Sequence, residues 1–390
     1  MKQKWRTRVI VAGSLICMIG GCFIFGGTKA ILKSWKNQIV QEIQETAEML
    51  YFPGISFRET TGEKKTFGNY IAEMSMNIFP LGKYIVGKTD AKAEVEDEAT
   101  YEMLVKRQAE DENQVDENGN LVGEDLSETT KPVETTMDLS IEKLSDYEYL
   151  VGHFYTVDSV TYVEPSDLNA SDFMKKDMKL KADENGPKVL IFHTHSQERF
   201  VDSNGDASTS IVGVGRYLTE LLNEKYQIET IHHEGVYDLI NGKLDRSEAY
   251  ELARPKIAAI LKENPSIEVV IDLHRDGVNA STHLVTEIGG RQTAQIMFFN
   301  GMCRTRANGN LSGMSNPYIQ DNLAFSLQMK VAAETKYPGF TRRIYLKGYK
   351  YNMDFCPKML LIEAGAQTNT VGEMRNAMEI LAELLNDVLK

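Results

Sequence analysis

Short apolar runs alternate with amphipathic segments through the second half of the chain. Each run is bounded by polar turns, a pattern that predicts a buried strand. The predicted strands cover residues 188–192, 228–231, 267–271, 295–299 and 359–362. Apolar residues at helical spacing predict helices at 211–226, 246–262, 322–336 and 374–389, with Pro255 inside the second of them. Strands that alternate with helices predict an α/β domain, a mostly parallel sheet flanked by helices, which we place at 187–390.

An uncharged run from 9 to 28 lies near the N-terminus. It is long enough to cross a bilayer as a helix, and the cations within residues 1–8 favour a cytoplasmic tail there. The sequence therefore predicts a transmembrane anchor at 9–28, with the remainder of the chain outside the cell membrane. A cleaved signal peptide and lipoprotein-like processing at Cys22 are the alternatives, and both also export the remainder.

Three regions separate the predicted anchor from the α/β domain. Residues 29–88 include apolar positions at near-helical spacing and are expected to form a small extracytoplasmic region. Residues 89–147 contain an acidic stretch that is almost free of apolar side chains. Such a sequence buries too little apolar surface to offset the entropy of ordering, so we expect a flexible linker. Residues 148–186 are expected to lead into the domain.

Charge and cysteine usage exclude some classes of function. The net charge is −13 and the pI is about 5.2, which argues against a general nucleic-acid binder. The chain has four cysteines and no CxxC spacing, so a zinc cage built from thiolates is not expected. The sequence leaves open whether Cys303 and Cys356 form a disulfide.

Polar motifs follow three of the predicted strands. The sequence reads HTHSQE at 193–198, DLHRD at 272–276 and IEAG at 362–365. Because the carboxyl ends of parallel strands meet at one edge of a sheet, imidazoles and carboxylates from these motifs can converge there. Two histidines and a glutamate make a zinc site, and a further glutamate can activate water for hydrolysis.

Particular residues are assigned to this site. His195 and His274 are the expected histidine ligands, and Glu198 is the expected third ligand because it follows His195 at HxxE spacing. Asp272 or Asp276 can accept the second ring N–H of His274. The fallback carboxylate ligands are Glu220, Glu224 and Glu234.

Other residues of the motifs have roles that are less tightly defined. A carboxylate at an apolar strand end is costly to bury unless it is paired or functional, so we expect Glu363 to be the general base. The alternative is a structural carboxylate that caps a helix near 368–370. His193 can face the same side as His195, either supporting the site or contacting the substrate. The adjacent histidines at 232–233 point apart and are expected at the surface.

Taken in order, the motifs resemble the stage II sporulation protein P family. They lie at 189–198, 272–276, 351–354 and 361–370, and the resemblance covers about residues 187–389. The family is similar in fold to the zinc N-acetylmuramoyl-L-alanine amidases. That similarity implies a Zn²⁺ ion on His195, Glu198 and His274, with Glu363 as the catalytic glutamate. Gly277 and the pair Ala366-Gln367 depart from the usual family pattern, which bears on the shape of a substrate loop.

The resemblance also implies a function. It implies a membrane-anchored, zinc-dependent peptidoglycan hydrolase that cleaves the amide between N-acetylmuramic acid and the L-alanine of the stem peptide. Its setting would be septal wall degradation and engulfment during endospore formation. Expected partners are peptidoglycan, the cell membrane and the lytic transglycosylase stage II sporulation protein D, and no nucleic acid. The alternatives are a metallo-endopeptidase of peptide cross-links and a non-catalytic peptidoglycan-binding scaffold.

Substrate binding is expected to use cations near the metal. Within the implied amidase mechanism, Arg275 is a candidate to hold the developing oxyanion or a stem-peptide carboxylate. Arg291 is a further candidate for that carboxylate, and His193 completes the expected substrate-binding residues.

Overall fold

The computed structural model describes residues 137–181 and 185–390. The chain divides into two units, 1–94 and 95–390, and every described residue belongs to the second. The expected cytoplasmic tail, membrane anchor and extracytoplasmic region lie outside the described residues, as does the linker up to residue 136. Among the residues that are described, no helix is both long enough and apolar enough to cross a membrane.

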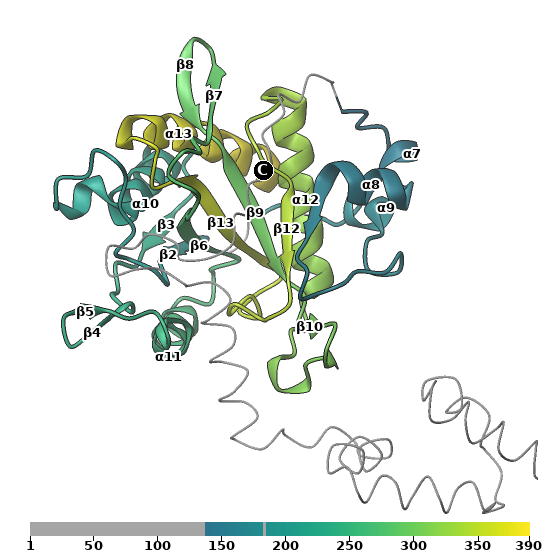
Figure 1. Cartoon of the computed structure of the whole chain (residues 1–390), viewed down its shortest axis with the longest axis horizontal. Helices are drawn as coiled ribbons and strands as arrows, with labels where there is room; N and C mark the ends of the chain where they lie inside the picture. Colours follow the sequence, from purple (N-terminus) through teal and green to yellow (C-terminus); the bar gives the residue numbers. More distant parts are fainter. Residues whose placement is uncertain (1–136, 182–184) are drawn as a thin grey trace, which may run out of the picture. The chain divides into compact units, whose positions relative to one another are not determined.

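A seven-stranded sheet forms the centre of the described domain (Figure 1), with strand order β1-β12-β9-β13-β6-β2-β3. The strands are β1 Tyr155–Val157, β12 Ile344–Lys347, β9 Ile296–Gly301, β13 Lys358–Ala366, β6 Val269–Asp276, β2 Val189–Phe192 and β3 Thr230–His232. Neighbouring strands are parallel except β13 and β9, which are antiparallel. The predicted α/β class with a mostly parallel sheet is confirmed, and the sheet is mixed because of this one pair.

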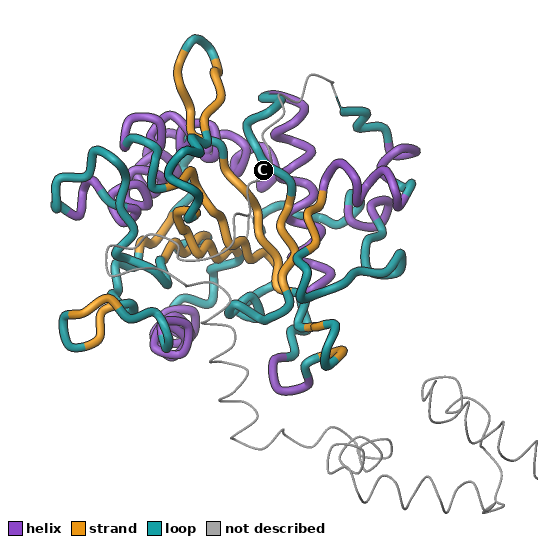
Figure 2. The backbone as a smooth tube through the Cα atoms, in the orientation of Figure 1, coloured by secondary structure: helices purple, strands orange, loops and turns teal. Residues whose placement is uncertain are grey.

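Helices surround the sheet (Figure 2). The longer ones are α10 Ile211–Glu220, α11 Ala249–Glu263, α12 Ile319–Lys336 and α13 Val371–Leu389. A π-helical turn, η2, continues α10 over Leu221–Lys225. The predicted helices are therefore confirmed, with ends that differ by a few residues. α11 begins later than predicted and keeps Pro255 in its interior.

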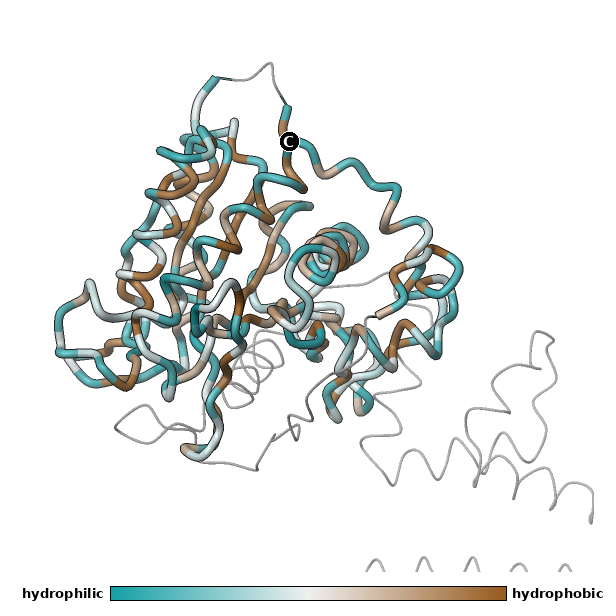
Figure 3. The backbone as a smooth tube through the Cα atoms, turned by 90° about the horizontal axis from the view of Figure 1, so that it is seen from above, coloured by the Kyte–Doolittle hydropathy of each residue, from teal (hydrophilic) through white to brown (hydrophobic). Residues whose placement is uncertain are grey.

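Alternate residues of a strand face two separate apolar cores, as the two-residue period of a strand requires. On β2, Val189 and Ile191 pack in one core with side chains of α10, α12 and α13. Leu190 and Phe192 pack in the other core with side chains of α11. Apolar and polar stretches alternate along the helices (Figure 3), as expected for helices that pack one side against a sheet. Because both faces of the sheet are covered, its central strands are apolar at successive positions.

The folded domain begins well before residue 187. Helices α7 Ile141–Leu144, α8 Tyr147–Phe154 and α9 Ala170–Phe173 precede the predicted domain, and β1 forms one edge of its sheet through Thr156 opposite Tyr345. Phe154 and Phe173 are buried in the same core as α12. The segment expected as a lead-in therefore supplies a strand and part of the core.

Several short elements carry no recognisable pattern in the sequence. They are β12 and the hairpins β4–β5 (Leu239–Ile240, Lys243–Leu244), β7–β8 (Val285–Ile288, Arg291–Ala294) and β10–β11 (Arg304–Thr305, Gly309–Asn310), with the 3₁₀ turns η1 (Ala207–Thr209) and η3 (Ser312–Met314). Two to four residues are too few for a period of two to stand out from chance. Tertiary contacts decide their conformation.

The pairing of Cys303 and Cys356 is also settled. Both are free thiols. Burial raises the pKa of each thiol to about 12, so neither is a thiolate nucleophile at neutral pH.

Candidate metal centre

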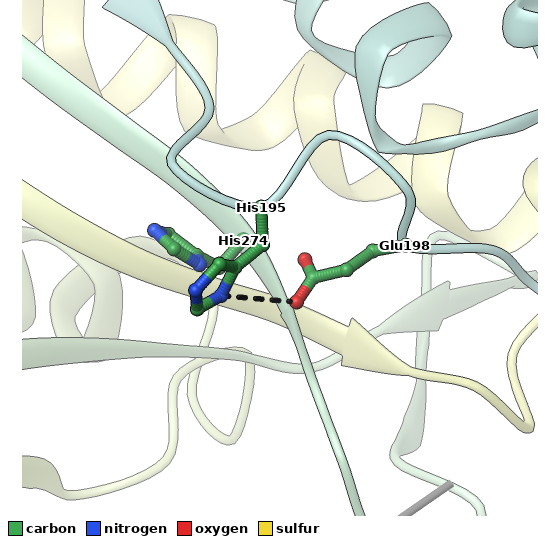
Figure 4. Close-up of side chains that lie close together, drawn as sticks. All are labelled: His195, Glu198 and His274. Atoms are coloured by element: carbon green, nitrogen blue, oxygen red, sulfur yellow. Dashed lines mark ion pairs between the residues drawn. The ribbon is translucent and has the colours of Figure 1, made fainter. Parts of the chain in front are cut away.

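His195, Glu198 and His274 converge beyond the end of β2, beside β6 (Figure 4). Each can offer one ligand atom, and these atoms all lie within 4.8 Å of one another. His195 Nδ1 is 3.7 Å from Glu198 Oε1. The three side chains are buried, and the rings of His195 and His274 meet edge to face with centroids 4.9 Å apart. The structure thus brings together the three residues that the sequence analysis proposed as ligands.

Asp272 orients His274. Its Oδ1 lies 2.8 Å from His274 Nε2, as an ion pair. The same carboxylate accepts hydrogen bonds from Thr194 N at 2.9 Å and from Thr194 Oγ1 at 2.6 Å. Asp272 therefore ties the loop after β2 to β6 and places a negative charge beside the ring of His274. Of the two aspartates considered from sequence, the structure selects Asp272, since Asp276 pairs with Arg342 instead.

The two candidate histidine ligands are in opposite electrostatic settings. Burial, together with the nearby charges of Arg246, His274 and Arg275, holds the pKa of His195 well below its usual range. His195 is thus a neutral imidazole, the form that binds a metal. Burial also lowers the pKa of His274, but Asp272 outweighs it and raises that pKa to about 10. A metal that binds here must displace the proton of His274.

Glu198 is held by two groups outside the histidine pair. The backbone N–H of Arg275 donates to Glu198 Oε2 at 2.6 Å, and Arg246 Nη2 lies 3.4 Å from Oε1. A buried carboxylate without such partners would be costly. The two contacts fix its oxygens beside His195.

Glu363 lies on β13 directly opposite His274 of β6. Its neighbours Ile362 and Ala364 both point into the core that contains α12 and α13, so Glu363 itself faces the other side of the sheet, with His274. The alternative role as a helix cap is wrong. Thr370 caps α13, in a capping box with Glu373.

Arg275 is a buried guanidinium with few strong hydrogen bonds. Its side chain is buried and its Nε has no hydrogen-bond partner. Its Nη1 makes two long contacts, to Gln367 Oε1 at 3.4 Å and to the carbonyl oxygen of Asp276 at 3.5 Å. Arg291 differs, since it is exposed on β8 and pairs with Glu379 of α13 at 2.7 Å. Arg275 therefore lies beside the cluster with donor capacity to spare, and the contacts of Arg291 are with α13.

His193 is fully buried on the α10 side of the sheet. Its Nδ1 contacts the carbonyl oxygen of Leu273 at 2.7 Å, and its Nε2 contacts His232 Nε2 at 2.8 Å. Both ring nitrogens are thus engaged within the protein, and the expected role in substrate binding finds no support in this arrangement. His193 instead supports the strand that carries His274.

The surface location expected for His232 is wrong. Its side chain is only 7% exposed because it packs against His193. The strand alternation that places His232 and His233 on opposite sides turns one of them into the protein. Glu234, a fallback ligand, forms a bidentate ion pair with Arg216, whose Nε and Nη2 lie 3.0 and 2.9 Å from the two carboxylate oxygens. It lies outside the group of His195, Glu198 and His274.

Sequence reasoning missed three residues from the segment between β3 and α11 and from the start of that helix. They are Asp238, which hydrogen-bonds to Ser196 and to Gln197, Arg246 beside Glu198, and Tyr250, whose ring meets that of His195. This segment has no motif of its own, so only its contacts reveal it.

Residues 80–386 match the sequence model of the stage II sporulation protein P (SpoIIP) family. The chain belongs to this family. The family predicted from the motifs is therefore confirmed. A curated relative, stage II sporulation protein P of Bacillus subtilis (strain 168), is 23% identical over 233 residues, which are 56% of this chain and 55% of that protein. The chain thus aligns with about half the length of this relative.

Solved structures include weaker likenesses. The CwlD amidase of Clostridioides difficile, in complex with the GerS lipoprotein, shares 15% identity, with a TM-score of 0.33 over 52% of this chain and 98% of that one. A metallo-carboxypeptidase of Burkholderia cenocepacia shares 13% identity, with a TM-score of 0.30 over 54% of this chain and 59% of that one. Because both the sequence identities and the TM-scores are low, these two structures support no conclusion about this chain.

Proposed function

We propose that this chain is a zinc-dependent peptidoglycan hydrolase that cleaves the amide between N-acetylmuramic acid and the L-alanine of the stem peptide. Membership of the stage II sporulation protein P family supports a role in the cell wall during sporulation. The observation that carries the chemistry is the buried group of His195, Glu198 and His274, with Glu363 in register beside His274.

The donor set fits zinc. Two imidazoles and one carboxylate are a usual set for catalytic zinc, and three protein ligands leave a coordination position for the reaction. A carboxylate beside a ligand imidazole, as Asp272 lies beside His274, is a usual support for a zinc-bound histidine. When bound, zinc would polarise the amide carbonyl and make water more acidic.

The chain's own residues supply proton transfer and charge stabilisation. Glu363 takes a proton at a carboxylate oxygen from the attacking water and returns it to the nitrogen of the leaving amine. The guanidinium of Arg275 donates to the oxygen on which negative charge develops, or to a carboxylate of the stem peptide. The spare Nε donor of Arg275 supports this role.

The location and partners are proposed on the sequence and on family membership. The uncharged run at 9–28 supports a single-pass membrane anchor with the catalytic domain outside the membrane, at the sporulation septum. Stage II sporulation protein D is the proposed partner, because a transglycosylase that cuts glycan strands would complement an enzyme that removes stem peptides.

Digestion of purified peptidoglycan tests the proposal. The full-length chain is incubated with peptidoglycan, with zinc or with a chelator, and the products are identified by mass spectrometry. We expect free stem peptides with a new L-alanine amino terminus and peptide-free glycan, and their loss with chelator and return with added zinc. Cleavage confined to peptide cross-links would instead indicate an endopeptidase, and binding without products would indicate a scaffold.

A further inference from the structure

The two residues between His195 and Glu198 are tied to a distant aspartate. Asp238 Oδ1 accepts a hydrogen bond from Ser196 Oγ at 2.8 Å, and its Oδ2 accepts one from Gln197 N at 2.9 Å. Asp238 is fully buried and comes from the loop after β3. One carboxylate therefore holds the whole stretch of chain that joins the two ligands.

The same segment reaches both ligands directly. Arg246 Nη2 lies 3.4 Å from Glu198 Oε1, and the ring of Tyr250 meets that of His195 edge to face at 5.8 Å. We call residues 238–250 the clasp. It thus touches each residue from His195 to Glu198.

The clasp is itself braced. The backbone N–H of Asp245 donates to the carbonyl of Asp238 at 2.9 Å and closes the β4–β5 hairpin. Asn352 Nδ2 donates to the carbonyl of Tyr250 at 2.8 Å, and Arg254 Nη1 donates to Asn352 Oδ1 at 3.0 Å. Asn352 has a positive φ of 53°, a strained conformation that persists only where its surroundings impose it. The clasp is therefore anchored to the β12–β13 connection as well as to the ligand loop.

A clasp is needed because the ligand loop has no regular structure. On a helix, an imidazole and a carboxylate three residues apart are neighbours through helix geometry alone. Residues 195–198 form a turn outside any helix or strand, so nothing within the loop sets the distance from His195 to Glu198. An external carboxylate that accepts from both intervening residues can set it.

We propose that Asp238 is a positioning residue that fixes the spacing of His195 and Glu198 for metal binding. This inference rests on the proposed zinc-dependent function. It assigns to Asp238 a share of the metal affinity, although Asp238 accepts hydrogen bonds from Ser196 and Gln197 and would touch neither metal nor substrate. Residues that orient metal ligands from outside are typically worth about 10–100-fold in affinity.

Substitution of Asp238 tests the inference through zinc affinity, measured by competition with a chromophoric chelator on the full-length chain. Asp238→Ala removes both acceptors, and we expect zinc binding to weaken by about 10–100-fold. Asp238→Asn should restore most of the affinity, because its oxygen can still accept from Gln197 N while its amide donates to the hydroxyl of Ser196. The absorption spectrum of bound Co²⁺ should change with Asp238→Ala and recover with Asp238→Asn.

Asp158 offers a matched control. It is a buried carboxylate that accepts from a backbone N–H, Val160 N at 2.8 Å, and from a hydroxyl, Tyr345 Oη at 2.7 Å, but it lies at the end of the edge strand β1. Asp158→Ala should lower the melting temperature much as Asp238→Ala does and leave zinc affinity unchanged. Equal loss of zinc affinity in both variants would reduce Asp238 to a general contributor to stability and overturn the proposal.

Other outcomes are equally decisive. Wild-type zinc affinity in Asp238→Ala would refute the positioning role while leaving the proposed function intact. Wild-type protein that binds no zinc would refute the proposed function, and the positioning role with it. If Asp238→Ala fails to fold, Ser196→Ala provides the test, because it removes one of the two hydrogen bonds that Asp238 accepts. We expect zinc binding to weaken several-fold in Ser196→Ala. Unchanged zinc binding would overturn the proposal.

Discussion

Glu363 and His274 are register partners on two neighbouring parallel strands, β13 and β6. Side chains paired in this way leave the sheet on the same face, so a carboxylate stands next to a candidate metal ligand without belonging to the ligand group itself. The proposed metal ligands and the proposed proton acceptor are therefore different residues, so a substitution can test each role by itself.

Glu363→Gln should separate metal binding from catalysis. Glutamine keeps the size of the side chain and removes the proton acceptor, and general acid–base groups are typically worth about 10²–10⁴ in rate. We expect normal zinc and peptidoglycan binding with hydrolysis at least ~100-fold slower, measured by release of stem peptides. Loss of zinc would make Glu363 a ligand, and unchanged hydrolysis would remove it from the mechanism.

His274→Ala should abolish zinc binding and activity. The substitution removes one of the three proposed ligands, and the two that remain should not make a stable site. The matched control is His283→Ala, because His283 is half exposed and pairs with Glu373, outside the cluster. Zinc content of the purified variants is the measurement. A stoichiometric zinc ion in His274→Ala, with full turnover, would show that the site is elsewhere.

Gly215→Ala should disturb the histidine pair behind the metal centre. A Cβ atom at Gly215 would lie 2.5 Å from His193 Nε2 and 2.9 Å from His232 Nε2, closer than real Cβ contacts come. Overpacking of this kind costs about 1–3 kcal/mol of unfolding free energy. Gly152 of α8 is the control, because a Cβ there meets nothing within 4 Å. Gly152→Ala should be neutral or stabilising by up to ~1 kcal/mol, since alanine favours helix. Equal effects of the two substitutions in urea unfolding would argue against the close packing of Gly215.

His232 should make the fold sensitive to acid. Burial lowers the pKa of His232 from 6.5 to about 4. Between these values the unfolded chain binds more protons than the folded chain, so the free energy of unfolding falls as the pH decreases through this range. The contribution of His232 to stability is complete above pH 6.5. The contribution is up to about 3 kcal/mol, since one pKa unit corresponds to 1.36 kcal/mol.

The comparison with His232→Gln isolates this effect from the other titrating groups. Urea unfolding at pH 7.5 and at pH 4.5 gives, for each protein, the loss of unfolding free energy between the two pH values. We expect the loss in His232→Gln to be smaller by a few kcal/mol at most, because glutamine does not titrate. A variant that loses as much stability in acid as the wild type would show that His232 is not buried in its neutral form.

The residue types of the metal centre and the order of the main elements are readable from the sequence. Apolar runs such as 188–192 and 267–271 become β2 and β6, and the polar residues after or within each strand end converge as expected. This works because strand burial leaves a local signature, a short run that is apolar at successive positions, and because parallel strands align their carboxyl ends. The choice of His195, Glu198 and His274 also used the HxxE spacing and the resemblance to a known family.

Only the tertiary structure decided which way each polar side chain turns. His193 and His195 are two residues apart, yet one is buried against His232 and the other lies against His274, because both follow the end of β2 at Phe192 and strand alternation no longer sets their directions. Asp238 lies in a loop with no periodic pattern, and its role appears only where that loop meets Ser196 and Gln197. Contacts between residues far apart in the chain depend on packing of the whole domain, and no local pattern encodes them.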